Sequence, residues 1–228
     1  MKQTWCFGHL DGHFLARMEQ LLWLYHRPYD ALHPVVCFDE RPCFLIGDVI
    51  EPTSRCGGRV KREHYTYTKH GSCSVLAAIE PLTGKRLAHV KPRRTKKEYA
   101  LFLRDLARKY PKAEKIHLVQ DNLNTHSLGA LYEHFSPEQA FALGQRFEFH
   151  YTPKCASWLN MIEIEFSALA RQCLKRRIPS MKQLAAEVLA LMRHREQKSI
   201  KINWQFSIET ARTKLGRHYT EVRAGKAK

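Results

Sequence analysis

The sequence lacks a long apolar run, and it has few acidic residues for its size. No apolar stretch reaches the roughly 20 residues that a membrane-spanning helix needs. The opening segment, MKQTWCFGHLDGHF, does not contain the continuous apolar stretch of a secretion signal. We therefore expect a cytoplasmic protein that has no membrane partner.

Paired cysteine motifs are also missing. The chain has seven cysteines, none of them in a CxxC pair, and an odd number cannot all pair within one chain. A disulfide framework is therefore not expected, and buried cysteines are best interpreted as small core residues. We find no internal repeat and no low-complexity block other than a short basic tail.

The shortage of acids leaves a large positive charge. Lys and Arg total 38 against 22 Asp and Glu, which gives a formal net charge of +16. Such an excess informs about partners rather than fold. Nucleic acid is favoured, because Lys and Arg gain free energy when they displace the counterions of phosphates.

The pattern of apolar residues predicts an α/β fold with a mixed five-stranded sheet flanked by helices. With 228 residues, the chain suits one domain with small additions. We expect a helical lead-in over 1–33, the α/β domain over 34–198 and a basic extension over 199–228. Strands are expected at 34–40, 74–79, 86–90, 115–121 and 147–151, and an irregular segment at 41–72. Helices are expected before 30 and at 95–110, 126–135, 157–176 and 180–194.

Two aspartates follow apolar strands directly, Asp39 in VVCFD and Asp121 in IHLVQD. Each could simply begin a turn, which Asp does well. If the two strands are neighbours, however, the carboxylates converge at one edge of the sheet, where sites of α/β proteins gather.

A third carboxylate could come from the helix expected after Trp158. Glu163 and Glu165 are both candidates, and residues two apart on a helix point in nearly opposite directions, so only one can face the aspartates. Glu163 could instead serve a capping box with Asn160.

Carboxylates held close together repel one another unless a cation lies between them. Oxygen-only ligands suit Mg²⁺ or Mn²⁺. Two such ions about 4 Å apart can activate an attacking oxygen and stabilise a leaving one.

The stretches CFDE, VQDNLNTH and TPKCASWLNMIEIEF together resemble the DDE transposases of the mariner-like superfamily, in its bacterial insertion-sequence branch. That family shows an Asp at the end of the first strand, Asp-Asn and a nearby His after the fourth, and a Leu-Asn-Pro-Ile-Glu-like motif that opens a helix. This chain departs from it at Met161, where many relatives have Pro.

The resemblance implies an RNase H-like fold and a DNA transposase catalytic domain that cleaves and transfers DNA strands at insertion-sequence ends. It implies that Asp39, Asp121 and Glu163 are the catalytic residues and hold two Mg²⁺ or Mn²⁺ ions, and that Asn122 and His126 position groups near the site. Double-stranded DNA, a homodimer on DNA and TA target sites are implied in the same way.

Basic runs provide candidate contacts to the DNA backbone. Any one run is more often a solvated face, but together, in a chain this basic, they favour a path for phosphates. The candidates are Arg59, Lys61, Arg62, Arg93, Arg94, Lys96, Lys97, Lys175 and Arg176.

Two other functions remain open on the sequence. One is another RNase H-like nuclease, such as an RNase H or a resolvase, and the other is an inactive transposase remnant that only binds nucleic acid. Helix-turn-helix domains of the kind that begin full-length family members are not evident before Asp39.

Overall fold

A single mixed sheet organises the chain. The computed structural model describes residues 10–50 and 64–225, and its five strands have the order β3-β2-β1-β4-β5. β1 pairs antiparallel with β2 and parallel with β4; β2–β3 is antiparallel and β4–β5 parallel. The strands are β1 (Val35–Asp48), β2 (Tyr67–Ile79), β3 (Arg86–Lys91), β4 (Ile116–Gln120) and β5 (Phe147–Tyr151). The predicted fold class is confirmed.

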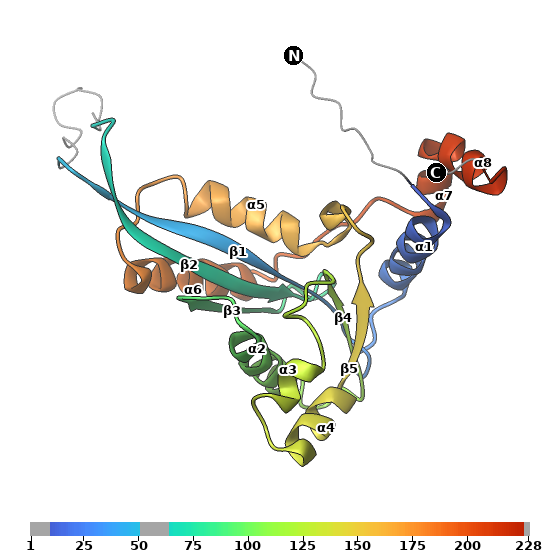
Figure 1. Cartoon of the computed structure of the whole chain (residues 1–228), viewed down its shortest axis with the longest axis horizontal. Helices are drawn as coiled ribbons and strands as arrows, with labels where there is room; N and C mark the ends of the chain where they lie inside the picture. Colours follow the sequence, from blue (N-terminus) through green and yellow to red (C-terminus); the bar gives the residue numbers. More distant parts are fainter. Residues whose placement is uncertain (1–9, 51–63, 226–228) are drawn as a thin grey trace.

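Helices cover both faces of this sheet (Figure 1). Because strand side chains alternate, Phe38 packs with the α2 side and Cys37 with the α1 and α5 side, in two separate apolar clusters. The helices are α1 (Gly12–His26), α2 (Lys96–Lys109), α3 (Gly129–Tyr132), α4 (Pro137–Gln145), α5 (Ile162–Gln172), α6 (Met181–Gln197), α7 (Ile208–Lys214) and α8 (Gly216–Arg223). No helix in the described part of the chain is long and apolar enough to cross a membrane.

The prediction of an irregular segment over 41–72 is wrong at both of its ends. β1 continues to Asp48 and β2 begins at Tyr67, so the two strands form long arms that project beyond the rest of the sheet (Figure 1). Pro42 suggested a break, but it lies within the pairing, opposite Ser74. The register of the β1–β2 pairing shifts between Leu45 and Ile46, as it does at a β-bulge, and the pairing then continues to Asp48.

The segment between β4 and β5 also differs from the prediction. The helix expected over 126–135 is reduced to the single turn of α3, and His126 precedes it in a turn. A further helix, α4, was not predicted. Its signals were present in the sequence, because Ser136 caps the backbone N–H of Gln139 and Pro137 occupies the first turn.

The helix expected over 157–176 is interrupted. Ser157–Leu159 is a 3₁₀ turn, and α5 begins only at Ile162. The interruption places Glu163 in the first turn of α5, and Asn160 fills the corner between the two pieces.

Residues after α6 return to the sheet and to α1. The backbone N–H of Ile202 donates to the carbonyl of Pro81 at 3.0 Å. Gly84, with φ +79°, faces the carbonyl of Ile200 so closely that a Cβ would lie 2.8 Å from it. Further along, Ala211 and Leu215 are buried in the same apolar cluster as α1.

Candidate active site

Strand pairing sets Asp39 and Asp121 beside each other. β1 and β4 are parallel neighbours, with Val35 opposite His117 and Cys37 opposite Val119. If this register continues by two residues, Asp39 falls opposite Asp121. Asp39 lies within β1, opposite Ala77 of β2, whereas Asp121 directly follows the carboxyl end of β4. Strand alternation then puts both side chains on one face of the sheet.

Asp39 is the most perturbed of these acids. Burial raises its pKa to about 7, and the negative charges of Asp121 and Glu163 act in the same direction. The backbone N–H of Glu40 donates to Asp39 Oδ1 at 2.7 Å and opposes the shift. The electrostatic influence of Asp121 and Glu163 on Asp39 shows that the fold brings the three carboxylates into one neighbourhood.

His126 joins Asp121 to a second acid. Its Nδ1 lies 2.5 Å from Asp121 Oδ1, and its Nε2 lies 3.3 Å from Glu40 Oε1. Burial disfavours the charged imidazole, but the contacts with Asp121 and Glu40 outweigh it and raise the pKa of His126 to about 9. The ring is therefore a cation at neutral pH, and it fixes the Asp121 carboxylate from the side opposite the solvent.

The imidazole is held by aromatic and polar neighbours. Tyr99 stacks on it at a centroid distance of 4.8 Å, and Phe38 meets it edge to face. The Tyr99 hydroxyl donates to Gln120 Oε1 at 2.7 Å, and Gln120 Nε2 donates to the carbonyl of His126. These contacts leave the ring little freedom to turn.

Glu163 and Glu165 have different surroundings. Glu163 is half-buried at the start of α5, and its pKa is raised by burial, against the positive charge of Arg41. Glu165 is 1% exposed and accepts hydrogen bonds from both Arg86 and Arg195, at 2.7–3.1 Å. Its oxygens are occupied within the fold, which leaves Glu163 as the acid that can serve the site.

The donor set of the three acids fits a hard divalent cation. Carboxylate oxygens are preferred ligands of Mg²⁺ and Mn²⁺, and Asp39, half-buried among like charges, is the kind of group that a cation would stabilise. The three acids do not form a closed ligand group. Within the described residues, the group of three possible ligands whose atoms all lie within 4.8 Å is a different one: His117, Glu148 and His150.

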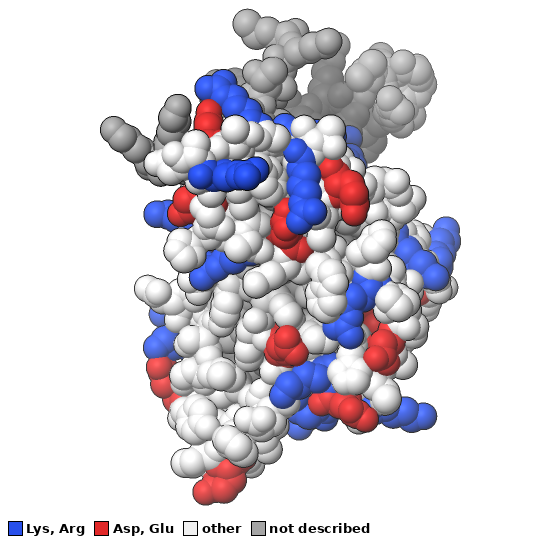
Figure 2. Space-filling model, turned by 90° about the vertical axis from the view of Figure 1, so that its right-hand side faces the viewer, with Lys and Arg blue, Asp and Glu red and all other residues white. Residues whose placement is uncertain are grey.

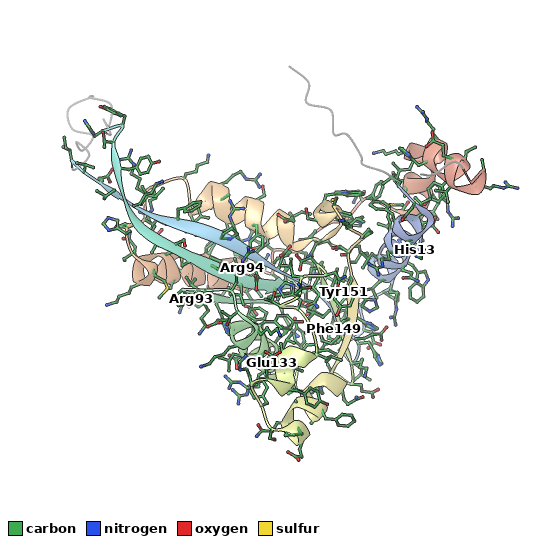
Figure 3. The ribbon with its side chains drawn as sticks, in the orientation of Figure 1. His13, Arg93, Arg94, Glu133, Phe149 and Tyr151 are labelled. Carbon is green, nitrogen blue, oxygen red and sulfur yellow. The ribbon has the colours of Figure 1, made fainter. Side chains whose placement is uncertain are left out.

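The remaining predicted site residues are scattered over the surface. Asn122 is exposed beside Asp121. Arg93 and Arg94 are exposed before α2 (Figure 3), and Lys97 is exposed in the first turn of α2. Lys96 pairs with Glu133, and Arg176 with Glu187.

Lys175 is exposed after α5. Arg59, Lys61 and Arg62 lie outside the described residues. On the face shown in Figure 2, basic and acidic side chains alternate, and no continuous basic band crosses it.

Sequence reasoning missed three residues that shape the site. Glu40 holds His126, Arg41 acts on Glu163, and Asn160 Nδ2 donates to the carbonyl of Phe38 at 2.8 Å. Strand alternation offered a signal for Arg41, which lies on the same side of β1 as Asp39. The contacts of Glu40 and Asn160 join residues more than 80 positions apart, and no local pattern reveals them.

A mixed sheet with helices on both faces, with Asp39 within β1 and Asp121 directly after the neighbouring strand β4, is typical of an RNase H-like domain with an acidic site. The chain belongs to the DDE superfamily of endonucleases, whose family model matches residues 34–185. Membership in this family supports an endonuclease class of enzyme.

Solved structures agree on the fold. The Mos1 strand transfer complex matches at a TM-score of 0.59 and 14% identity, covering 100% of this chain and 66% of that chain. The Mos1 mariner paired end complex with Mn has a TM-score of 0.57 and 14% identity, covering 100% of this chain and 67% of that chain. The paired end complex with Mg has a TM-score of 0.54 and 14% identity, covering 100% of this chain and 66% of that chain. The chain thus spans about two thirds of the Mos1 length. Among curated proteins, none matches it in sequence.

Proposed function

We propose that this chain is the catalytic domain of a DNA transposase that cleaves DNA strands at the ends of an insertion sequence and joins them to target DNA. The observation that carries the proposal is that the charges of Asp121 and Glu163 both act on Asp39, within a DDE-superfamily domain. We assign the chain to the bacterial insertion-sequence branch on its DN and LNMIE motifs.

In this proposal Asp39, Asp121 and Glu163 hold two Mg²⁺ or Mn²⁺ ions. Two bound cations would activate the attacking oxygen and neutralise the leaving one. His126 orients Asp121, and Glu40 in turn orients His126. Asn122 is proposed to position the substrate, because it is exposed directly after Asp121.

The proposed substrate is double-stranded DNA, both element end and target. The Mos1 structures are paired end and strand transfer complexes, which supports DNA as the partner here, and a homodimer on DNA is proposed with it. Arg93, Arg94, Lys97 and Lys175 would contact phosphates, as would Arg59, Lys61 and Arg62, which lie outside the described residues. Lys96 and Arg176 would do so only by leaving their acidic partners.

The test is a Mg²⁺-dependent cleavage and strand-transfer assay on Asp121→Asn. We expect cleavage to be lost and DNA affinity to be kept or raised, because the change removes a metal ligand and a charge that repels phosphate. Asp105→Asn on α2 is the matched control, since Asp105 forms ion pairs with His89, Arg104 and Arg108 and is not assigned to the site. Equal cleavage by both variants would contradict the proposed site.

Substrate choice separates the transposase from other RNase H-like nucleases. A preference for the RNA strand of an RNA–DNA hybrid, or for a four-way junction, would replace the transposase assignment. DNA binding with no cleavage in Mg²⁺ or Mn²⁺ would identify an inactive remnant.

A further inference from the structure

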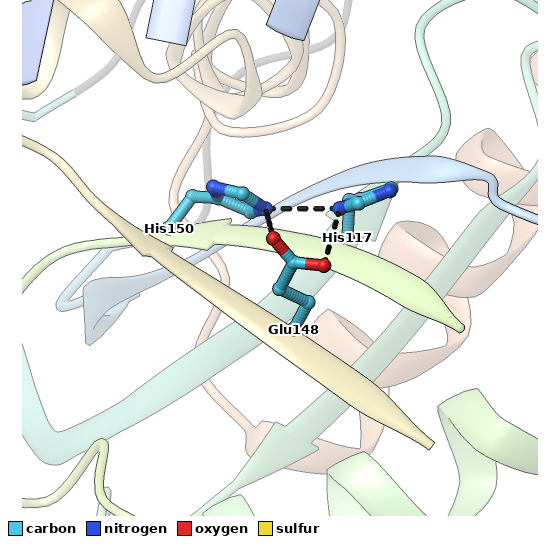
Figure 4. A group of neighbouring side chains, drawn as sticks. All are labelled: His117, Glu148 and His150. Atoms are coloured by element: carbon cyan, nitrogen blue, oxygen red, sulfur yellow. Dashed lines mark hydrogen bonds and ion pairs between the residues drawn. The ribbon is translucent and has the colours of Figure 1, made fainter. Parts of the chain in front are cut away.

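A second cluster of possible metal ligands lies away from the three acids. His117 is on β4, and Glu148 and His150 are on β5, where Glu148 is the strand partner of His117 (Figure 4). His117 and Asp121 are four residues apart on β4, a separation of roughly 13 Å at about 3.3 Å per residue. The cluster is therefore distinct from the candidate active site.

The distances within the cluster match a metal polyhedron. His117 Nδ1 lies 3.0 Å from His150 Nε2 and 3.5 Å from Glu148 Oε2, and His150 Nε2 lies 3.4 Å from Glu148 Oε1. Ligands at roughly 2.0–2.1 Å from a tetrahedral zinc ion lie about 3.3 Å from one another. The three ligand atoms can thus bind one ion with only small movements.

We propose that His117, Glu148 and His150 form a zinc-binding site, with water as the fourth ligand. Two imidazoles and one carboxylate suit Zn²⁺ and are poor ligands for Mg²⁺. The ion would join β4 to β5, which is at the edge of the sheet and leads into the segment that positions α5.

The cluster is both accessible and suited to binding a cation. Glu148 is exposed on 51% of its side chain, so the site is open to solvent. Burial lowers the pKa of both His117 and His150, which favours the neutral form of the rings that metal binding requires.

Arg27 opposes metal binding in the present arrangement. Its Nη1 lies 3.2 Å from His117 Nε2, so Nε2 accepts that hydrogen bond and Nδ1 carries the ring proton. Zinc at Nδ1 requires this proton to move to Nε2, and the Arg27 guanidinium must then turn away. Removing Arg27 should therefore strengthen zinc binding, a result that a chance cluster of side chains would not give.

The experiment is calorimetric titration of the whole chain with Zn²⁺, alongside Co²⁺ absorption as a probe of tetrahedral geometry. We expect the chain to bind one equivalent of zinc and His150→Ala to abolish this binding. Glu148→Gln should lower the zinc affinity by at least about 10-fold, because loss of even an outer-shell partner lowers metal affinity by about that much. Arg27→Gln should bind more tightly. Asp39→Asn should keep this equivalent, which separates it from the three acids and from the proposed transposase function.

Because Glu148 is exposed, Glu148→Gln tests the site without disturbing the core, and circular dichroism checks that each variant is folded. Zinc binding that is unchanged in both Glu148→Gln and His150→Ala would overturn the proposal, as would Mg²⁺ competing equally for the site. Cleavage assays would remain interpretable in either case, since they address other residues.

Discussion

Glu163 and Glu165 are two positions apart on α5 and have different chemical environments. Glu163 is half-buried, close enough to Asp39 and Arg41 for charge to act between them, whereas Glu165 accepts hydrogen bonds from two arginines in the core. A buried carboxylate between two guanidinium groups neutralises charge that would otherwise be costly to bury. One glutamate is thus available for chemistry, and the other stabilises the fold.

This difference gives a paired prediction. Glu163→Gln should abolish Mg²⁺-dependent cleavage with little change in the free energy of unfolding. Glu165→Gln should destabilise the chain by about 3 kcal/mol, because two buried arginines lose their counter-charge. Urea denaturation together with a nicking assay measures both effects.

The sequence alone left Glu165 as an alternative third carboxylate, and its contacts with Arg86 and Arg195 argue against that role. If Glu165→Gln proved stable and inactive while Glu163→Gln stayed active, the third ligand would have to be reassigned. Glu138→Gln, at an exposed position on α4, controls for loss of a surface carboxylate.

Between elements, the corner before α5 fixes the helix to β1. Asn160 Nδ2 donates to the carbonyl of Phe38, one residue before Asp39, and Asn160 Oδ1 lies 3.4 Å from the N–H of Ile162. On the other side, the Tyr25 hydroxyl of α1 donates to the carbonyl of Leu159 at 2.9 Å. These bonds set how far Glu163 lies from Asp39.

We therefore predict that Asn160→Ala weakens both stability and metal binding. The buried carbonyl of Phe38 would lose its donor, at a cost of roughly 1–3 kcal/mol. Mg²⁺ affinity, measured by calorimetry on the folded variant, should fall because α5 is no longer tied to β1. Asn124→Ala, at an exposed position, should change neither quantity. Full Mg²⁺ affinity in Asn160→Ala would show that the bond serves stability alone.

Elements were predictable where local pattern decides them. The apolar runs before Asp39 and Asp121 predicted two strands, and in the structure these strands, β1 and β4, are parallel neighbours. The arms of β1 and β2 were missed because Pro42 resembles a strand break, whereas long-range pairing overrides that local preference. The bond between Glu165 and Arg86 links residues 79 apart and could not be read from spacing.

Across the whole molecule, the C-terminal helices are attached to α1 by one polar cluster. Arg212 on α7 binds Glu19 through two hydrogen bonds of 2.8 Å, and the Tyr219 hydroxyl on α8 donates to the same carboxylate at 2.7 Å. The hydrogen bond from Arg212 lowers the pKa of Glu19, against the effect of burial.

The attachment should therefore weaken in acid. A carboxylate whose pKa is lower in the folded chain stabilises it above the ordinary value of 4.5, and that contribution is lost as the pH falls through the folded pKa. The protection factors of the α7 and α8 amides in hydrogen exchange, which are corrected for the intrinsic rate at each pH, should fall below about pH 4.5. Glu19→Gln should remove this pH dependence, and an unchanged pH profile in that variant would contradict the assignment.

Net charge should govern how the whole molecule binds DNA. With 38 basic and 22 acidic residues, the chain should bind DNA of any sequence, and its affinity should fall steeply with salt, with a log–log slope of about −0.9 for each phosphate neutralised. Basic residues without an acidic neighbour should contribute most. Arg93→Gln or Arg94→Gln should each reduce the magnitude of the slope by about 0.9 if the side chain contacts a phosphate.

Lys96→Gln and Arg176→Gln provide the matched comparison, because each removes the same charge from a residue already paired with Glu133 or Glu187. Their slopes should change less, since those side chains must give up an ion pair before they can bind a phosphate. Fluorescence anisotropy over a salt series measures all four variants. Equal salt-dependence slopes in every variant would place the DNA path elsewhere on the surface. A strong preference for one DNA sequence at physiological salt would show that this domain contacts bases as well as phosphates.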